Sequence, residues 1–246
     1  MAAAAELSRR EFLELSGKAL ASLIIPFGKL DEPSEAKELP PLTEARPGLS
    51  MEQAQHLKEA SEKYIAREYP KAVEVARRLD FIRNQEIEDP SNICGPLSVA
   101  QLRDADLLSE ETNIADFWLP NPEPPGNALF ERTFPRDRYD WMVADQAVDR
   151  IDFKQSPLFS GDLIFLRSGG RGSFGHMLVV TNVGPDGEVY SVTNVNSPNG
   201  FIIDEVMLYD PNHPGKGQFY KWTDPKNEKL GLTGFGGFFL WRLRYN

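Results

Sequence analysis

The chain has 246 residues, of which 41% are hydrophobic and 26% are charged, as in an ordinary globular domain. Lysine and arginine total 27 against 37 acidic residues, and the net charge of −10 disfavours a nucleic-acid partner, since phosphate binding needs a basic face. The single cysteine, Cys94, excludes an internal disulfide framework. Neither zinc-ligand spacing nor a nucleotide-binding glycine loop is present, so we expect no metal and no cofactor.

The amino terminus carries Ser8-Arg9-Arg10-Glu11-Phe12-Leu13 and then a short apolar stretch. This pattern resembles a bacterial twin-arginine export signal, which we place at residues 1–28. The resemblance implies the twin-arginine export machinery as a partner, and a location in the periplasm or outside the cell. Gly17 and Lys18 make the stretch a poor transmembrane helix, so we expect membrane contact only through this segment. An amphipathic surface helix is the alternative.

Residues 29–49 are rich in Pro, Glu and Lys and are predicted to be a solvated linker, which leaves one domain at 50–246. Ser50 and Gln53 form a capping box that predicts a helix through about Glu68. Pro70 suits the first turn of a second helix.

A third helix is predicted to begin at Cys94, after the turn residues Asp89-Pro90-Ser91-Asn92 and with Pro96 in its first turn. Its apolar residues fall on several sides, which predicts a buried helix. A loop is expected at 119–127 and a helix near Asp137 to Val148.

The remainder reads as strands: 163–166, 176–183, 189–194, 201–209 and 237–243, with a tight connection at 184–187. Helices followed by an antiparallel sheet predict an α+β domain. Asp162 is expected to fix the start of a strand through hydrogen bonds, and His56 and His213 to lie at the surface.

Cys94 at a helix N-terminus has the position of a reactive thiol, because the partial positive charge there is expected to lower the cysteine pKa. His176 is the plausible base. It begins a strand whose face it shares with Leu178 and Val180, and the two side chains can meet if the Cys94 helix packs on that face.

The next strand can supply a group that orients the second ring nitrogen of His176. Asn194 is the preferred candidate, with Asn196 and Thr193 as competitors. A shift of one residue in strand register would change the answer, because it would exchange the two faces.

Cys94-Gly95-Pro96, followed by small residues, resembles the cysteine motif of bacteriocin-processing papain-like peptidases. Ser160-Gly161-Asp162-Leu163-Ile164-Phe165, with Gly175-His176 on the next strand, resembles the NlpC-type cell-wall endopeptidases. Both belong to the papain-like superfamily, and the resemblance spans roughly residues 85 to 196. It implies a papain-like α+β fold, with the nucleophile helix packed on a mostly antiparallel sheet.

The resemblance further implies an oxyanion donor shortly before the cysteine, for which Gln85 is the first candidate and Asn92 the second. It predicts an exported cysteine hydrolase that cleaves peptide or amide bonds, with cell-wall peptides as one candidate substrate, through Cys94, His176 and Asn194. The alternative is a catalytically inactive papain-like binding or structural protein of the cell envelope. A lone cysteine is more often inert core than nucleophile, and only its context favours catalysis.

Overall fold

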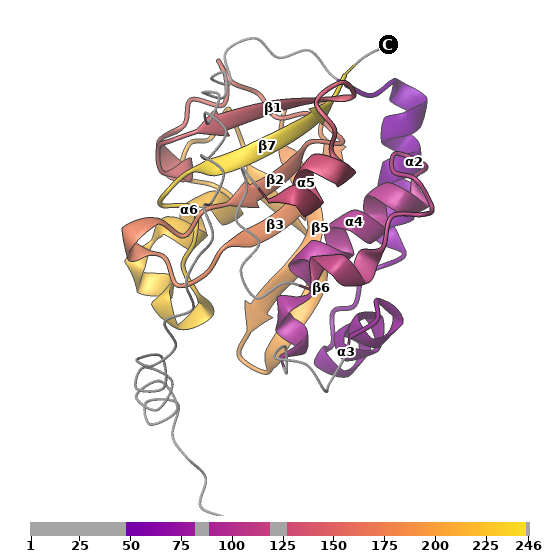
Figure 1. Ribbon diagram of the computed structural model, residues 1–246. Helices are drawn as coiled ribbons and strands as arrows, with labels where there is room; N and C mark the ends of the chain where they lie inside the picture. The colour runs from indigo at the N-terminus through magenta and orange to yellow at the C-terminus, as the bar shows by residue number, and fades with distance from the viewer. Residues whose placement is uncertain (1–47, 82–88, 119–126, 245–246) are drawn as a thin grey trace, which may run out of the picture. The chain divides into compact units, whose positions relative to one another are not determined.

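The computed structural model describes residues 48–81, 89–118 and 127–244 (Figure 1). The predicted export signal and linker residues 29–47 lie outside the described residues. Gly48 and Leu49 are buried, so at least two residues before the predicted domain boundary at 50 take part in the packing. In the described part of the chain, no helix combines the length and apolarity needed to cross a bilayer.

Helix α2 (Met51–Glu62) begins with the predicted capping box. The Gln53 amide donates to Ser50 Oγ at 3.2 Å, and the Ser50 amide donates to Gln53 Oε1 at 2.9 Å. The helix ends at Glu62 rather than near Glu68, because the backbone of Ala66 turns away to pair with Ile203. Helix α3 (Tyr69–Arg78) carries a proline in its first turn, as predicted.

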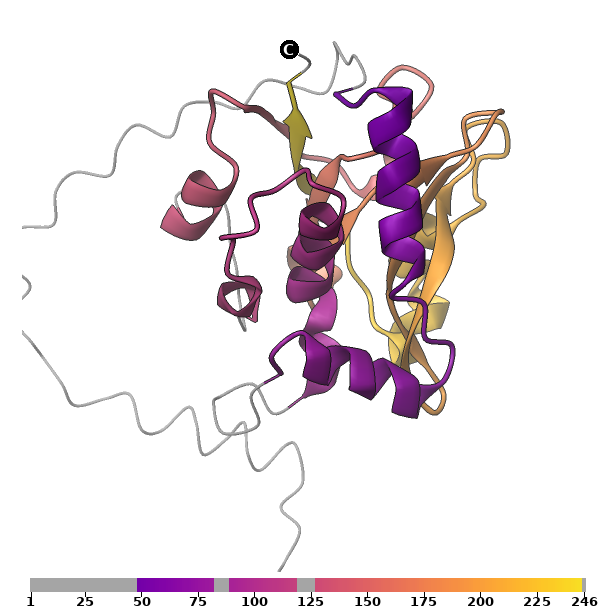
Figure 2. The same cartoon turned by 90° about the vertical axis from the view of Figure 1, so that its right-hand side faces the viewer.

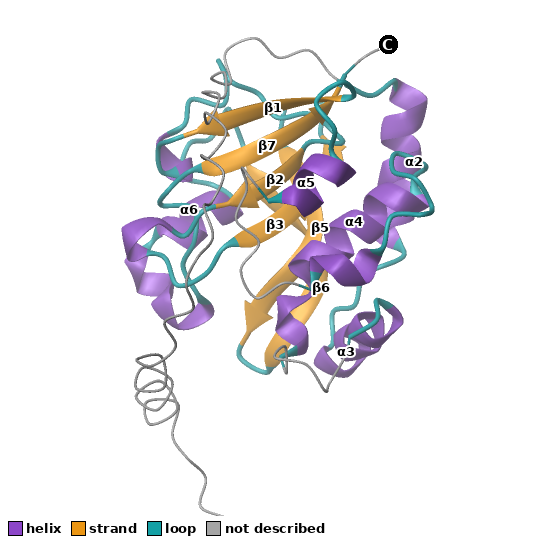
Figure 3. Ribbon diagram, in the orientation of Figure 1, coloured by secondary structure: helices purple, strands orange, loops and turns teal. Residues whose placement is uncertain are grey.

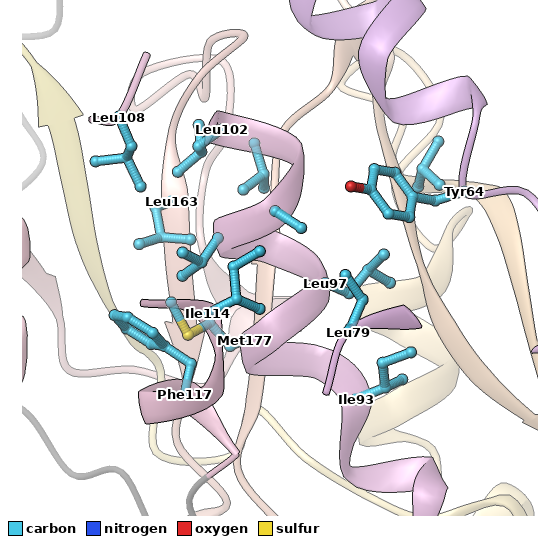
Figure 4. Packing of buried hydrophobic residues seen from close by; sticks show 14 of the residues in the cluster. Tyr64, Leu79, Ile93, Leu97, Leu102, Leu108, Ile114, Phe117, Leu163 and Met177 are labelled. Atoms are coloured by element: carbon cyan, nitrogen blue, oxygen red, sulfur yellow. The ribbon is translucent and has the colours of Figure 1, made fainter. Parts of the chain in front are cut away.

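The 3₁₀ helix η1 (Pro90–Ile93) leads directly into α4 (Cys94–Asp104), so the third helix begins at Cys94 as predicted. Every residue from Gly95 to Leu102 is buried, which confirms the prediction of a buried helix. Figure 4 shows apolar side chains on both sides of α4, with Met177 and Phe117 on one side and Ile93 and Leu97 on the other. Helix α2 runs beside α4 in Figure 2.

The strands form two sheets, and every pairing among the described residues is antiparallel. The larger sheet has the order β1 (Tyr139–Ala144), β7 (Phe238–Leu243), β2 (Leu163–Leu166) and β3 (His176–Val179). The smaller has the order β4 (Asn182–Val183), β5 (Val189–Ser197) and β6 (Gly200–Tyr209). The α+β class is therefore confirmed.

The predicted apolar run 176–183 divides into β3 and β4 where the chain passes from one sheet to the other. Val180 still donates its amide to Asp162 beside β2, whereas Thr181 donates to Tyr190 in β5, both at 2.9 Å. This change of sheet places the start of β3 beside the middle of β5, where His176 meets Thr193.

The helix predicted near Asp137 to Val148 is wrong, because β1 occupies Tyr139–Ala144. Trp141 pairs with Trp241 in β7, a partner so far along the chain that local periodicity cannot reveal it. The short helical segments were not predicted: η2 (Ile114–Phe117), α5 (Ala128–Thr133), η3 (Val148–Arg150), η4 (Gly169–Arg171), α6 (Gln218–Thr223) and η5 (Pro225–Leu230). Of the predicted loop at 119–127, residues 119–126 lie outside the described residues.

Helices cover both faces of the larger sheet, as the arrangement in Figure 3 indicates. Along β3, Met177 and Val179 belong to the apolar core around α4, whereas Leu178 and Val180 belong to a second core that contains Trp222 of α6. This alternation follows from the period of two in a strand, and it decides which side of the sheet each candidate residue faces.

Asp162 fixes the start of β2, as expected. Its carboxylate accepts from the Phe159 amide at 2.8 Å and from Arg242 Nε and Nη2 at 2.7 and 2.5 Å. Arg242 lies on β7, so the buried pair joins the last strand to β2.

Candidate active site

Cys94 is the first residue of α4, and no side chain caps this helix end. Gly95 allows the close packing there: a Cβ at this position would lie 2.5 Å from the carbonyl oxygen of Phe117 in η2. Ser98 donates its hydroxyl to the Cys94 carbonyl at 2.8 Å, one turn along the helix. The Cys-Gly-Pro motif thus has a steric reason at glycine, and the first-turn amides remain free of side-chain caps.

The Cys94 sulfur lies against the start of β3, where the backbone N–H of Met177 donates toward it. Cys94 keeps a partly exposed surface at the edge of the core around α4. Burial nevertheless raises the pKa of the Cys94 thiol, and the amides of Met177 and Gly95 oppose this effect only in part. The expected lowering of the pKa at the helix N-terminus is therefore wrong, because desolvation outweighs the favourable amides.

His176 is 3% exposed, and its Nε2 lies 3.0 Å from Thr193 Oγ1. The Trp222 ring packs edge-on at a centroid distance of 5.0 Å, and the Phe174 ring at 6.0 Å. Burial lowers the pKa of His176 to about 4, so the imidazole is neutral at pH 7. Nδ1 makes no hydrogen bond to a described residue, so it is the nitrogen that remains available as a base.

The expectation that α4 packs on the strand face shared by His176 and Leu178 is wrong, and His176 packs against Trp222 of the opposite core. Helix α4 packs on the face of β3 that carries Met177, whereas Leu178 lies in the opposite core. The Cys94 sulfur instead lies against the strand backbone at Met177, one residue after His176 and near the start of β3. No hydrogen bond joins the sulfur to the imidazole among the described residues.

The strand register assigns the partner of His176 to Thr193 rather than to Asn194. Asn194 lies on the opposite face of β5, where its Nδ2 donates to the Ser91 carbonyl at 2.9 Å. Its Oδ1 is buried and has no partner among the described residues. Asn196 donates to the Leu230 carbonyl at 2.8 Å. The preference for Asn194 was wrong by one residue, which is the register error that exchanges faces.

The two oxyanion candidates have different outcomes. Gln85 lies outside the described residues. Asn92 is exposed in η1, and its side chain makes no hydrogen bond to a described residue. The Met177 amide and the aromatic neighbours of His176 were not predicted. Phe174 is close to His176 in sequence, but nothing local indicates Trp222, which belongs to an unpredicted helix.

The other histidines lie away from this site. His213 Nδ1 pairs with Asp210 Oδ2 at 2.6 Å, and His56 lies 3.8 Å from Asp106; both histidine side chains are exposed. In the described ranges, no group of His, Cys, Asp and Glu side chains is arranged to hold a metal ion.

No protein-family model, curated protein or solved structure matches this chain. The papain-like interpretation therefore depends on the motifs and on the geometry around Cys94 and His176.

Proposed function

We propose that this chain is an exported papain-like cysteine hydrolase that cleaves peptide or amide bonds. One observation carries the proposal: the amide that faces the Cys94 sulfur belongs to Met177, the residue directly after the buried His176, whose Nε2 lies against Thr193. A thiol, a base with one free nitrogen and a fixed second nitrogen are the groups that nucleophilic catalysis needs.

In the proposed reaction, His176 Nδ1 removes the thiol proton as the Cys94 sulfur attacks the carbonyl carbon. The Cys94 backbone N–H is the proposed donor to the oxyanion, and His176 then protonates the leaving amine. Water hydrolyses the acyl-enzyme and restores the thiol. Because thiol and imidazole are both neutral at rest, proton transfer accompanies attack rather than preceding it.

The test is hydrolysis of a fluorogenic peptide mixture by the whole chain and by Cys94→Ala and His176→Ala. We expect both variants to lose at least about a hundredfold in rate. His213→Ala is the matched control, because it removes an exposed histidine. Circular dichroism would check that each variant folds. Full activity in Cys94→Ala would reject the proposal.

Alkylation of Cys94 by iodoacetamide provides a second test. The raised pKa predicts slow labelling at pH 6 and 7 and a rise in rate above pH 9, as the thiolate forms. Rapid labelling at pH 6 that disappears in His176→Ala would instead indicate a thiolate–imidazolium pair at rest.

A second candidate is an inactive binding protein on the same frame. It is favoured by the two neutral groups and by the lack of a hydrogen bond between sulfur and imidazole among the described residues. If the protein only binds a ligand, the Cys94→Ala variant should keep both ligand binding and the biological effect of the wild type. A variant that binds the ligand but has lost the biological effect would contradict this second candidate.

A further inference from the structure

Two loops meet beside His176. The Ser173 amide donates to the Leu232 carbonyl at 2.8 Å, and the Leu232 amide donates to Ser173 Oγ at 3.1 Å. A Cβ on Gly231 would lie 2.5 Å from Phe174 Cε1, so the phenyl ring rests on the backbone of the second loop. The loop after η5 is therefore fixed to the segment that leads into His176.

Strand β5 ties the same loop to the segment that carries Cys94. Asn196 holds the Leu230 carbonyl at 2.8 Å, and Asn194 holds the Ser91 carbonyl at 2.9 Å. These asparagines are two residues apart on one face of the strand, a spacing of about 7 Å. Leu230 and the segment before Cys94 are thus held beside each other.

Apolar side chains are exposed at this junction. Leu230 is 43% exposed, and Phe174 is partly exposed with its ring centroid 6.0 Å from that of His176. A single exposed leucine is ordinary at a protein surface. Here the leucine ends η5 immediately before one of the two bonded loops, and the phenylalanine lies in the other loop, beside the candidate base.

We infer that Phe174 and Leu230 contact an apolar side chain of the substrate, on the leaving-amine side of the cleaved bond. The inference rests on the proposed function. His176 must protonate the leaving amine, so that part of the substrate lies on the histidine side of the sulfur. A charged side chain placed on these two residues would lose water without gaining a partner. The substrate class is therefore a peptide or amide whose leaving amine belongs to an apolar residue.

The experiment uses a peptide library with every residue after the cleaved bond, digested by the whole chain and read by mass spectrometry. We expect kcat/KM to favour Leu and Phe over Lys at that position by about tenfold or more. Phe174→Ala and Leu230→Lys should each reduce this ratio severalfold, because the apolar contact with the substrate side chain is lost. Met51→Lys is the control, because Met51 is 91% exposed on α2.

Equal cleavage before apolar and charged residues would overturn the inference and leave the hydrolase proposal standing. So would an unchanged ratio in both loop variants. If no peptide is cleaved, or if cleavage persists in Cys94→Ala, the proposed function fails and the inference fails with it.

Discussion

Burial acts in opposite directions on the thiol and the imidazole of the candidate site. It raises the pKa of Cys94 and lowers that of His176, because both effects disfavour the charged form. The resting pair is consequently neutral. A polar substrate or water entering the site would reduce this penalty, so the charge state of the pair depends on what occupies the site.

The lowered pKa of His176 predicts a stability that depends on pH. An unfolded histidine binds a proton below about 6.5, whereas the folded one resists until about 4, so folding loses stability as the pH falls through this window. The full loss is roughly 3 kcal/mol. Urea unfolding at pH 7 and at pH 4.5 measures how much the free energy of unfolding decreases between the two. We expect a smaller decrease for His176→Gln than for wild type, and the wild-type decrease for His213→Gln. The same decrease in all three proteins would contradict this explanation.

Thr193 is expected to position His176 rather than to react. Thr193→Val keeps the shape but removes the oxygen 3.0 Å from Nε2, which should lower kcat/KM by about fivefold for a bond worth roughly 1 kcal/mol. Thr193→Ser should restore the rate, and NMR of the His176 ring should report a changed tautomer balance only in the valine variant. A valine variant with wild-type rate and spectrum would show that the contact does not orient the ring.

At the scale of elements, the site is held by close approaches of backbone. Helix α4 contacts η2 through Gly95, and Gln101 Nε2 donates to the Val192 carbonyl of β5 at 2.7 Å. These two contacts fix the distance between α4 and the strands beneath it, and they therefore fix the position of Cys94 relative to β3.

Gly95→Ala tests this dependence. The added methyl group would lie 2.5 Å from the carbonyl oxygen of Phe117. This oxygen belongs to the backbone and cannot rotate away as a side chain could, so the helix must shift. We expect a loss of about 2 kcal/mol, which lowers Tm by roughly 4–8 °C. Gly170→Ala is the matched control, since nothing lies within 4 Å of a Cβ there. Equal melting temperatures for the two variants would show that α4 has room to move.

At the scale of the whole molecule, the C-terminal strand completes the sheet that carries the histidine. Strand β7 lies between β1 and β2, and Arg242 within it reaches the buried carboxylate of Asp162. Burial raises the pKa of Asp162, and the Arg242 guanidinium opposes this effect. Removing the arginine alone leaves a buried carboxyl group without its partner.

Arg242→Met should therefore cost roughly 3–5 kcal/mol in urea unfolding. Arg244→Met breaks the exposed pair with Asp140 and should cost only about 0–1 kcal/mol. The double variant Asp162→Leu with Arg242→Met should recover part of the loss, because no charge remains buried. A similar cost for the two single variants would mean that the buried pair is no more important than the exposed one.

Local chemistry along the chain was enough to predict several features: the capping box at Ser50, the helix that begins at Cys94, most strands and the α+β class. Each depends on neighbours within a few residues, or on periodicity that a short segment carries by itself. Thr193, Trp222 and the strand at Tyr139 could be assigned only from the tertiary structure, because their partners are distant in sequence. The same is true of the two pKa directions at the site, since burial is a property of the packed molecule and of no single segment.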